Sequence, residues 1–157
     1  PFVINKGASE TLQVTVAPSG AKTEDLLWLS SDETMATVKD GVVTAKATGG
    51  EVTITAYSKT DETVKASKTV IIKEDVTNIN IHDDRLDMKV GQTYQLEVTV
   101  YPVNAYDKSV TWSTNDPKVV TVDNNGLVKA VGKGTAVVFV QSNDSGQMMS
   151  CLITVTE

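Results

Sequence analysis

The chain repeats its own pattern after 84 residues. The segment Leu12–Pro18 (LQVTVAP) returns as Leu96–Pro102 (LEVTVYP), and Trp28 returns as Trp112, so both pairs are 84 positions apart. A period of this length describes a whole small domain and is too long for a solenoid unit. The 157-residue chain is therefore predicted to hold two domains, residues 1–73 and 74–157.

Apolar and polar residues alternate with a period of two in both halves. The alternation is clearest in Leu12–Val16, Val52–Ala56 and Leu96–Val100. Such a period predicts strands with one face on a core and the other in water, and no stretch shows a helical repeat. Turn signals separate about seven short strands per half, which is typical of antiparallel sandwiches. We expect an all-β chain of two tandem antiparallel β-sandwiches.

Two hairpin turns are marked by Asp40-Gly41 and Asn125-Gly126, each set between apolar runs. Such pairs supply the positive φ angles of tight hairpins. The second half also opens with an apolar strand at Val76–Ile81, whose counterpart 84 positions earlier would precede Pro1. We expect the first domain to lack its first strand, or another segment to supply it. The short junction, without a Gly/Ser tract, predicts an end-to-end rod with limited bending.

Composition excludes several classes of function. Hydrophobic residues make up 40% of the chain but aromatic residues only 5%, which predicts cores of Val, Leu, Ile and Ala. The net charge of -6 and the absence of a basic cluster argue against nucleic acid as a partner. The sequence contains no run of about 18 apolar residues, the length that a membrane-spanning helix needs, so membrane insertion is not predicted. Because the sequence starts at Pro1 without Met, we expect it to be a piece of a longer chain.

Three residues with distinctive chemistry have structural interpretations. Trp28 and Trp112 share the phase of the apolar residues around them, which predicts core positions, the alternative being ligand stacking. Cys151 is the single cysteine, so no intrachain disulfide can form, and we expect a buried strand residue in preference to a reactive thiol.

The second half resembles the bacterial immunoglobulin-like domain, group 2. The resemblance rests on Val90–Leu96 (VGQTYQL), Val110–Ser113 (VTWS), Asn115–Pro117 (NDP) and Asn125–Ala136 (NGLVKAVGKGTA), in that order and spacing. The first half keeps this signature with a shorter turn and with Leu29 in place of a serine. The resemblance implies an immunoglobulin-like sandwich, found in bacterial surface and secreted proteins, adhesins and tailed-phage virions. It implies no catalytic residues.

Acidic residues crowd the junction between the halves. Carboxylates converging between successive domains could bind calcium, because calcium prefers oxygen ligands; the alternative is a solvated acidic linker. The candidates are Glu74, Asp75, Asp83, Asp84 and Asp87. No other metal or cofactor is predicted: the single histidine, His82, is expected to be an exposed surface residue, and Asp123–Gly126 is expected to be a turn.

The two halves differ on the polar side of one strand. Val137 and Phe139 stand where the first half has Thr53 and Thr55, and Met148–Met149 follow in the sequence. An apolar strip on one repeat alone would mark an interface, unless another part of the chain or a neighbouring domain covers it. We take this strip as a candidate interaction surface.

Tyrosines offer a second candidate surface. A carbohydrate-binding site needs two or three exposed aromatic side chains, and the second half offers Tyr94, Tyr101 and Tyr106. Tyr94 shares the phase of Leu96 and is expected to point inward, which leaves Tyr101 and Tyr106 as candidates.

Together these observations predict a non-enzymatic extracellular module, a rigid spacer or cell-surface-binding segment of a larger bacterial surface protein. The alternatives are a virion-surface module of a tailed phage that aids host attachment, and an accessory or carbohydrate-binding domain of a secreted glycan-acting enzyme. The expected partners are neighbouring domains of a longer parent chain and a cell-surface protein or glycan.

Overall fold

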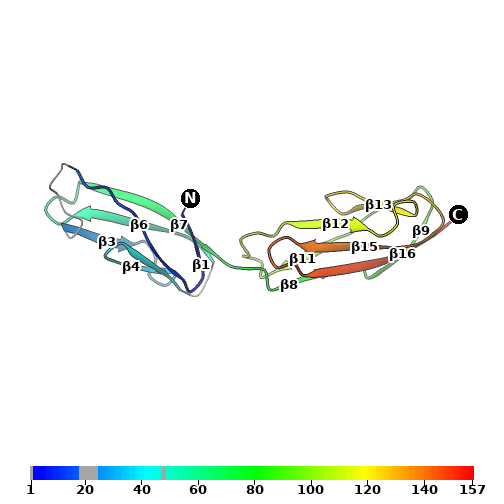
Figure 1. The fold of residues 1–157 in the computed structure, drawn as a ribbon, viewed down its shortest axis with the longest axis horizontal. Helices are drawn as coiled ribbons and strands as arrows, with labels where there is room; N and C mark the ends of the chain where they lie inside the picture. The colour runs from blue at the N-terminus through cyan, green and yellow to red at the C-terminus, as the bar shows by residue number, and fades with distance from the viewer. Residues whose placement is uncertain (1, 18–24, 47–48) are drawn as a thin grey trace. The chain divides into compact units, whose positions relative to one another are not determined.

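A computed structural model describes residues 2–17, 25–46 and 49–157. The chain divides into two compact units, Pro1–Glu74 and Asp75–Glu157, called unit 1 and unit 2 below. The described residues contain no α-helix, and so none that could cross a membrane. The prediction of an all-β chain of two sandwiches is confirmed (Figure 1).

Unit 1 contains a four-stranded and a three-stranded sheet. The first has the order β1-β7-β6-β3 and the second the order β2-β5-β4. All neighbours are antiparallel except β1 and β7, which are parallel. The strands are β1 (Phe2–Asn5), β2 (Ser9–Thr11), β3 (Leu26–Ser30), β4 (Ala36–Lys39), β5 (Val42–Ala45), β6 (Gly50–Ser58) and β7 (Lys65–Lys73).

Unit 2 repeats this arrangement and adds a pair of strands. Its sheets have the orders β12-β15-β16-β9, β10-β14-β13 and β11-β8, with β9 and β16 parallel. The strands are β8 (Asn78–Ile81), β9 (Arg85–Lys89), β10 (Thr93–Gln95), β11 (Val98–Tyr101), β12 (Val110–Thr114), β13 (Val120–Val122), β14 (Leu127–Ala130), β15 (Gly134–Ser142) and β16 (Met148–Thr156).

The extra pair, β8 and β11, is the main difference between the units. Strand β1 is the counterpart of β9, because each pairs in parallel with the last strand of its unit. The described part of unit 1 therefore has no counterpart of β8. Residues 14–17, the counterpart of β11 by sequence, form no strand.

Each unit encloses its own hydrophobic core of aliphatic side chains, as the low aromatic content predicts. The core of unit 2 contains seventeen buried residues, among them Ile79 and Ile81 of β8. The core of unit 1 contains nine such residues in the part of the chain that is described. Because buried apolar area is the dominant stabilising term in folding, we expect unit 2 to be the more stable unit.

Both predicted hairpin turns are confirmed. Asp40 and Gly41 have φ angles of 51° and 82°, as a two-residue turn between β4 and β5 requires. Gly126 has a φ angle of 83° in the longer turn before β14. There the Asp123 carboxylate accepts hydrogen bonds from the amides of Asn125 and Leu127, at 2.8 and 2.9 Å. Asp123 therefore stabilises a turn.

Candidate functional surfaces

Trp112 lies in the core of unit 2, as predicted, with only 9% of its surface exposed. Its six-membered ring packs on the turn at Gly126. Trp28 has the same relation to Gly41 in unit 1, but it is only partly buried and packs at the margin of the smaller core. The two tryptophans are therefore equivalent in position and unequal in burial.

The candidate strip on β15 faces away from the core. Phe139 lies between Ser113 and Ser150 in the sheet, and Val137 lies opposite Leu152. All three apolar side chains, Val137, Phe139 and Leu152, are half-buried. Together with Ser113 and Ser150 they form an outer face that is partly apolar and partly polar. The strand register thus adds Leu152 to Val137 and Phe139, which the sequence had suggested.

Unit 1 has an apolar outer face of a different kind. Its edge strand β3 presents Leu27 and Leu29, which are 42% and 54% exposed, where β12 presents Thr111 and Ser113. Leu29 lies opposite Thr55, the counterpart of Phe139. Sequence reasoning recorded Leu29 only as a departure from the repeat. The sequence could have identified this surface, because Leu27 and Leu29 flank the inward-facing Trp28 and must therefore face outward on a strand.

The tyrosines do not join the strip on β15. Tyr101 and Tyr106 are 42% and 48% exposed, but Tyr101 belongs to the β8–β11 pair and not to the sheet that carries Phe139. Tyr94 has the inward phase predicted for it, but it is not shielded from solvent. Tyr94 lies opposite buried Val128, but on a three-residue edge strand its side chain stays 40% exposed.

Glu74 forms close contacts inside unit 1. Its carboxylate accepts a hydrogen bond from the ammonium of Lys6 at 2.8 Å and another from the amide of Gly49 at 3.0 Å. These two donors lower the pKa of Glu74, the hydrogen bond from Lys6 contributing most. The Glu74 carboxylate thus joins the ends of the first and last strands of its unit.

The other calcium candidates lie in unit 2. Asp83 accepts a hydrogen bond from the Tyr94 hydroxyl at 3.1 Å, which raises the pKa of that tyrosine. Asp75, Asp84 and Asp87 are exposed, and Asp87 lies opposite Thr154 in the sheet. Within the described residues, no three His, Cys, Asp or Glu side chains are grouped as a metal site would require.

His82 is an exposed residue, as predicted. Its Nε2 atom lies 2.7 Å from the Thr99 hydroxyl, and its Nδ1 atom lies 3.3 Å from a Glu97 carboxylate oxygen. These contacts tie the end of β8 to β11 and leave the ring half in solvent.

Cys151 is fully buried in β16, so the structural interpretation is confirmed. Burial raises the pKa of its thiol to about 11, and the nearby carboxylates of Asp83 and Asp84 contribute in the same direction. A thiol with so high a pKa is a poor nucleophile at neutral pH.

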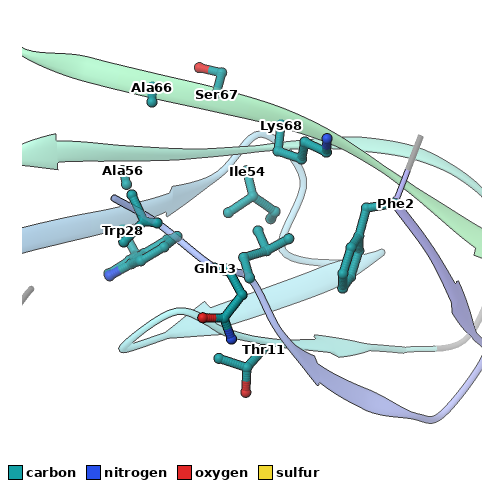
Figure 2. A pocket seen from close by; sticks show the side chains of 11 residues that line it. Phe2, Thr11, Gln13, Trp28, Ile54, Ala56, Ala66, Ser67 and Lys68 are labelled. Carbon is teal, nitrogen blue, oxygen red and sulfur yellow. The ribbon is translucent and has the colours of Figure 1, made fainter. Parts of the chain in front are cut away.

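Unit 1 has a groove that sequence reasoning did not identify. It encloses about 340 Å³ beside Leu12, Val14 and Trp28, with Phe2 and Lys68 at its margins. Figure 2 shows the Trp28 ring and the Ile54 side chain on its inner side. The missing counterpart of β8 was the signal in the sequence that could have located the groove.

Comparison with known proteins gives matches to both units. The model of the bacterial Ig-like domain (group 2) matches residues 2–70 and 75–152.

Three individual proteins match most of the chain. A Clostridium acetobutylicum protein of uncharacterised function is 37% identical over 150 residues, covering 94% of this chain and 15% of that protein. The lacto-N-biosidase of Bifidobacterium bifidum is 39% identical over 132 residues, covering 82% of this chain and 11% of the enzyme. The Ig-like virion protein of Serratia phage KSP90 is 29% identical over 154 residues, covering 96% and 60% respectively. The chain spans less than two thirds of each relative.

Proposed function

The chain belongs to the bacterial Ig-like domain (group 2) family, as its motifs predicted, and on that premise we propose that it is a non-enzymatic spacer in a longer extracellular protein. It holds another domain at a distance from the structure that anchors it. Its two domains are the two sandwiches: the sequence predicts residues 1–73 and 74–157, and the compact units are Pro1–Glu74 and Asp75–Glu157.

The path of the chain through unit 2 carries this proposal. The chain enters unit 2 beside the first residues of β16, where the Val76 amide donates to Asp144 at 2.7 Å and the Gln147 side chain donates to the Thr77 carbonyl at 2.9 Å. It leaves after Thr156, whose carbonyl accepts from the Val90 amide at the far end of the same strand. Nine residues of β16 span about 30 Å. Unit 2 therefore advances the chain by its own length.

The same path favours resistance to pulling. Strands β9 and β16 are parallel over five residue pairs, from Arg85–Leu152 to Lys89–Thr156. A force between the two ends of unit 2 slides these strands along each other, so their hydrogen bonds carry the load together. A force that opens the sheet from one end breaks the bonds one at a time.

Single-molecule pulling tests the proposal in two geometries. Handles at Asp75 and Glu157 load the strands in shear, and handles at Val90 and Glu157 pull from one end of the unit. We expect a clearly higher unfolding force in the first geometry. Equal forces would contradict a load-bearing role.

The parent chain can be of three kinds. A bacterial surface protein agrees best with a spacer role. The virion relative supports a module on a phage capsid or tail that aids host attachment, and the lacto-N-biosidase supports an accessory domain of a secreted glycan-acting enzyme. The sequence flanking these residues in the parent separates the three, because it contains a wall anchor, virion domains or a hydrolase.

A second candidate function is direct adhesion through the outer face of β15. The half-buried Val137 and Phe139, together with Leu152, favour it. The test is binding of the purified chain to bacterial cells and to a glycan panel, with and without calcium. Saturable binding that is lost in Phe139→Ser but kept in Leu29→Ser would assign adhesion to this face. Loss in Tyr106→Ala instead would assign it to the tyrosines, and no binding in any condition would leave the spacer role alone.

A further inference from the structure

Strand β3 lies at the edge of the four-stranded sheet of unit 1. It pairs with β6 on one side, and no other described strand pairs with it. Unpaired backbone groups at such an edge are a template for another strand, and proteins often protect them with charged side chains. The sequence of β3, LLWLS, contains no charge, whereas edge strand β9 of unit 2 reads RLDMK. Strand β3 therefore lacks this protection.

The hydrogen bonds at the two ends of β3 determine which of its backbone groups face the open edge. The Lys59 amide donates to the Asp25 carbonyl, and the Ser31 amide donates to the Thr53 carbonyl, each at 2.9 Å. Because hydrogen-bonded pairs alternate along antiparallel strands, the odd-numbered residues of β3 bond to β6. The amides and carbonyls of the even-numbered residues therefore face the open edge, and no described residue pairs with them. These residues are Leu26, Trp28 and Ser30.

The outward side chains of the same strand are apolar. Leu27 and Leu29 are 42% and 54% exposed, and Leu27 lies opposite Tyr57 of β6. The corresponding outward residues of β12 in unit 2 are Thr111 and Ser113. Cross-strand pairs of apolar side chains stabilise a sheet, so the edge of unit 1 gains most from a partner strand that presents apolar residues on the same face.

The edge of β3 is complementary to itself. When two copies of β3 run antiparallel with Trp28 opposite Trp28, Leu26 of each copy lies opposite Ser30 of the other. All the edge-facing amides and carbonyls of both strands then have partners. Sliding the strands by two residues in either direction leaves one of the three residues in each copy outside this ladder. The same register places Leu27 of each copy opposite Leu29 of the other, on the outer face.

Charge also favours an approach at this edge. The chain has a net charge of -6, so two copies repel each other in most orientations. Along the paired strands no like charges meet, because β3 is uncharged and Asp25, the residue before it, falls opposite Ser31 of the second copy. Two copies can therefore come together at β3 without charge repulsion between the strands.

The size of the contact predicts a weak dimer. Interfaces bury about 30–40 Å² for each residue, so the five residues of β3 and about as many neighbours on each side bury roughly 500–800 Å² in total. A stable interface buries at least about 1,200 Å². We expect a dissociation constant of about 1 mM.

We propose that β3 is a self-association site, at which two copies of the chain form a dimer by antiparallel pairing of their β3 strands about Trp28. The pairing joins the two four-stranded sheets into one continuous sheet, with two Leu27–Leu29 pairs at its centre. Because the paired strands run in opposite directions, the two copies of unit 1 do so as well. The site is separate from the outer face of β15 and does not depend on the proposed spacer role.

Disulfide crosslinking tests the register. Leu27→Cys and Leu29→Cys are prepared separately, mixed at about 1 mM in total and oxidised with diamide; Cys151 is fully buried. Directly opposite residues have Cβ atoms about 4.5–5.5 Å apart and diagonal residues about 7–8 Å, and a disulfide needs about 3.5–4.5 Å. We expect the mixture to give at least about tenfold more covalent dimer than either variant alone.

The matched control mixes Thr111→Cys with Ser113→Cys, the counterpart positions on β12. It should give only the small yield of random collisions. As much covalent dimer from Leu27→Cys alone or Leu29→Cys alone as from their mixture overturns the proposal, and so does a mixture that yields no more than the control. A higher yield from Leu29→Cys with Thr111→Cys also overturns it, because β3 then pairs with β12 of the second copy.

Sedimentation tests the dimer without added cysteines. Between about 10 µM and 1 mM, the weight-average mass of the unaltered chain should rise about 1.5-fold. Leu29→Lys should abolish the rise, because it places a charge among the leucines of the paired edge. Thr111→Lys is the matched control and should leave the rise unchanged. No rise in the unaltered chain, or the same rise in Leu29→Lys, overturns the proposal.

Discussion

The indole ring of Trp112 occupies the space that a side chain at Gly126 would need. A Cβ atom on Gly126 would lie 2.8 Å from Cζ2 of Trp112 and 2.9 Å from the carbonyl oxygen of Leu96. The Leu96 amide also donates a hydrogen bond to the Gly126 carbonyl at 3.0 Å. The turn and the core residue therefore depend on each other, although they are distant from one another in the sequence.

Replacing Gly126 by alanine should destabilise unit 2 in two ways, through steric overlap with Trp112 and through the positive φ angle, and a control at Gly91 distinguishes them. We expect Gly126→Ala to destabilise unit 2 by about 2–4 kcal/mol, the sum of a positive φ angle and overpacking. Gly91→Ala is the matched control, because Gly91 has a φ angle of 88° but nothing within 4 Å of its Cβ position. It should cost about 1–2 kcal/mol. Urea unfolding measures both, and equal losses would show that Trp112 yields to the added methyl group.

The two tryptophans should differ in their contribution to stability. Trp112→Ala should destabilise unit 2 by about 3–5 kcal/mol, because it empties a well-packed core position. Trp28→Ala should cost unit 1 about 1–3 kcal/mol, because Trp28 lies half-exposed at the groove. Denaturant unfolding of each variant measures the difference. A larger loss for Trp28 would contradict the burial seen here.

Glu74 should make the stability of unit 1 sensitive to acid. Its pKa in the folded chain is lowered from 4.5 by the hydrogen bonds from Lys6 and Gly49. The stabilisation is therefore fully present above pH 4.5 and is lost as the pH falls through the lower folded pKa. Glu74→Gln should flatten the decline of unit 1 stability below pH 4.5. An NMR titration in Lys6→Met should find the pKa of Glu74 closer to its ordinary value; an unchanged pKa would reject the ion pair.

Cys151 should report the unfolding of unit 2 alone. With its pKa raised to about 11 and its side chain fully buried, the thiol should react with iodoacetamide at pH 8 at least about a hundredfold more slowly in the native chain than in urea. Labelling across a urea series should give a midpoint that Trp28→Ala leaves unchanged. A shift of that midpoint would show that unit 2 does not unfold on its own.

Local patterns predicted much of the fold. Asp40-Gly41 and Asn125-Gly126 marked their hairpins because a positive φ angle is a property of the residues themselves. The period of two placed Trp112 inside, since alternation follows directly from strand geometry. The apolar character of a free cysteine placed Cys151 inside as well.

Features that depend on pairing between distant strands were not predicted. Tyr94 has the phase of a core residue, but the exposed edge of β10 leaves its side chain in solvent. The position of Lys68 opposite Ile54 requires the register of β6 with β7, which the alternation of either strand alone does not give. The candidate surfaces likewise needed the sheet order, because it separates Tyr101 from Phe139.

The exchange of Cys151 for Lys68 also bears on how neighbouring repeats fold without error. Similar tandem domains can misassemble by exchanging equivalent strands during synthesis and refolding. Lys68 lies opposite Ile54 as Cys151 lies opposite Val138. Strand β7 in the place of β16 would put the long Lys68 side chain at the fully buried position of the much smaller Cys151, and forcing a larger side chain into a packed core is unfavourable. The difference between the two units therefore discriminates against the hybrid that their similarity would otherwise permit.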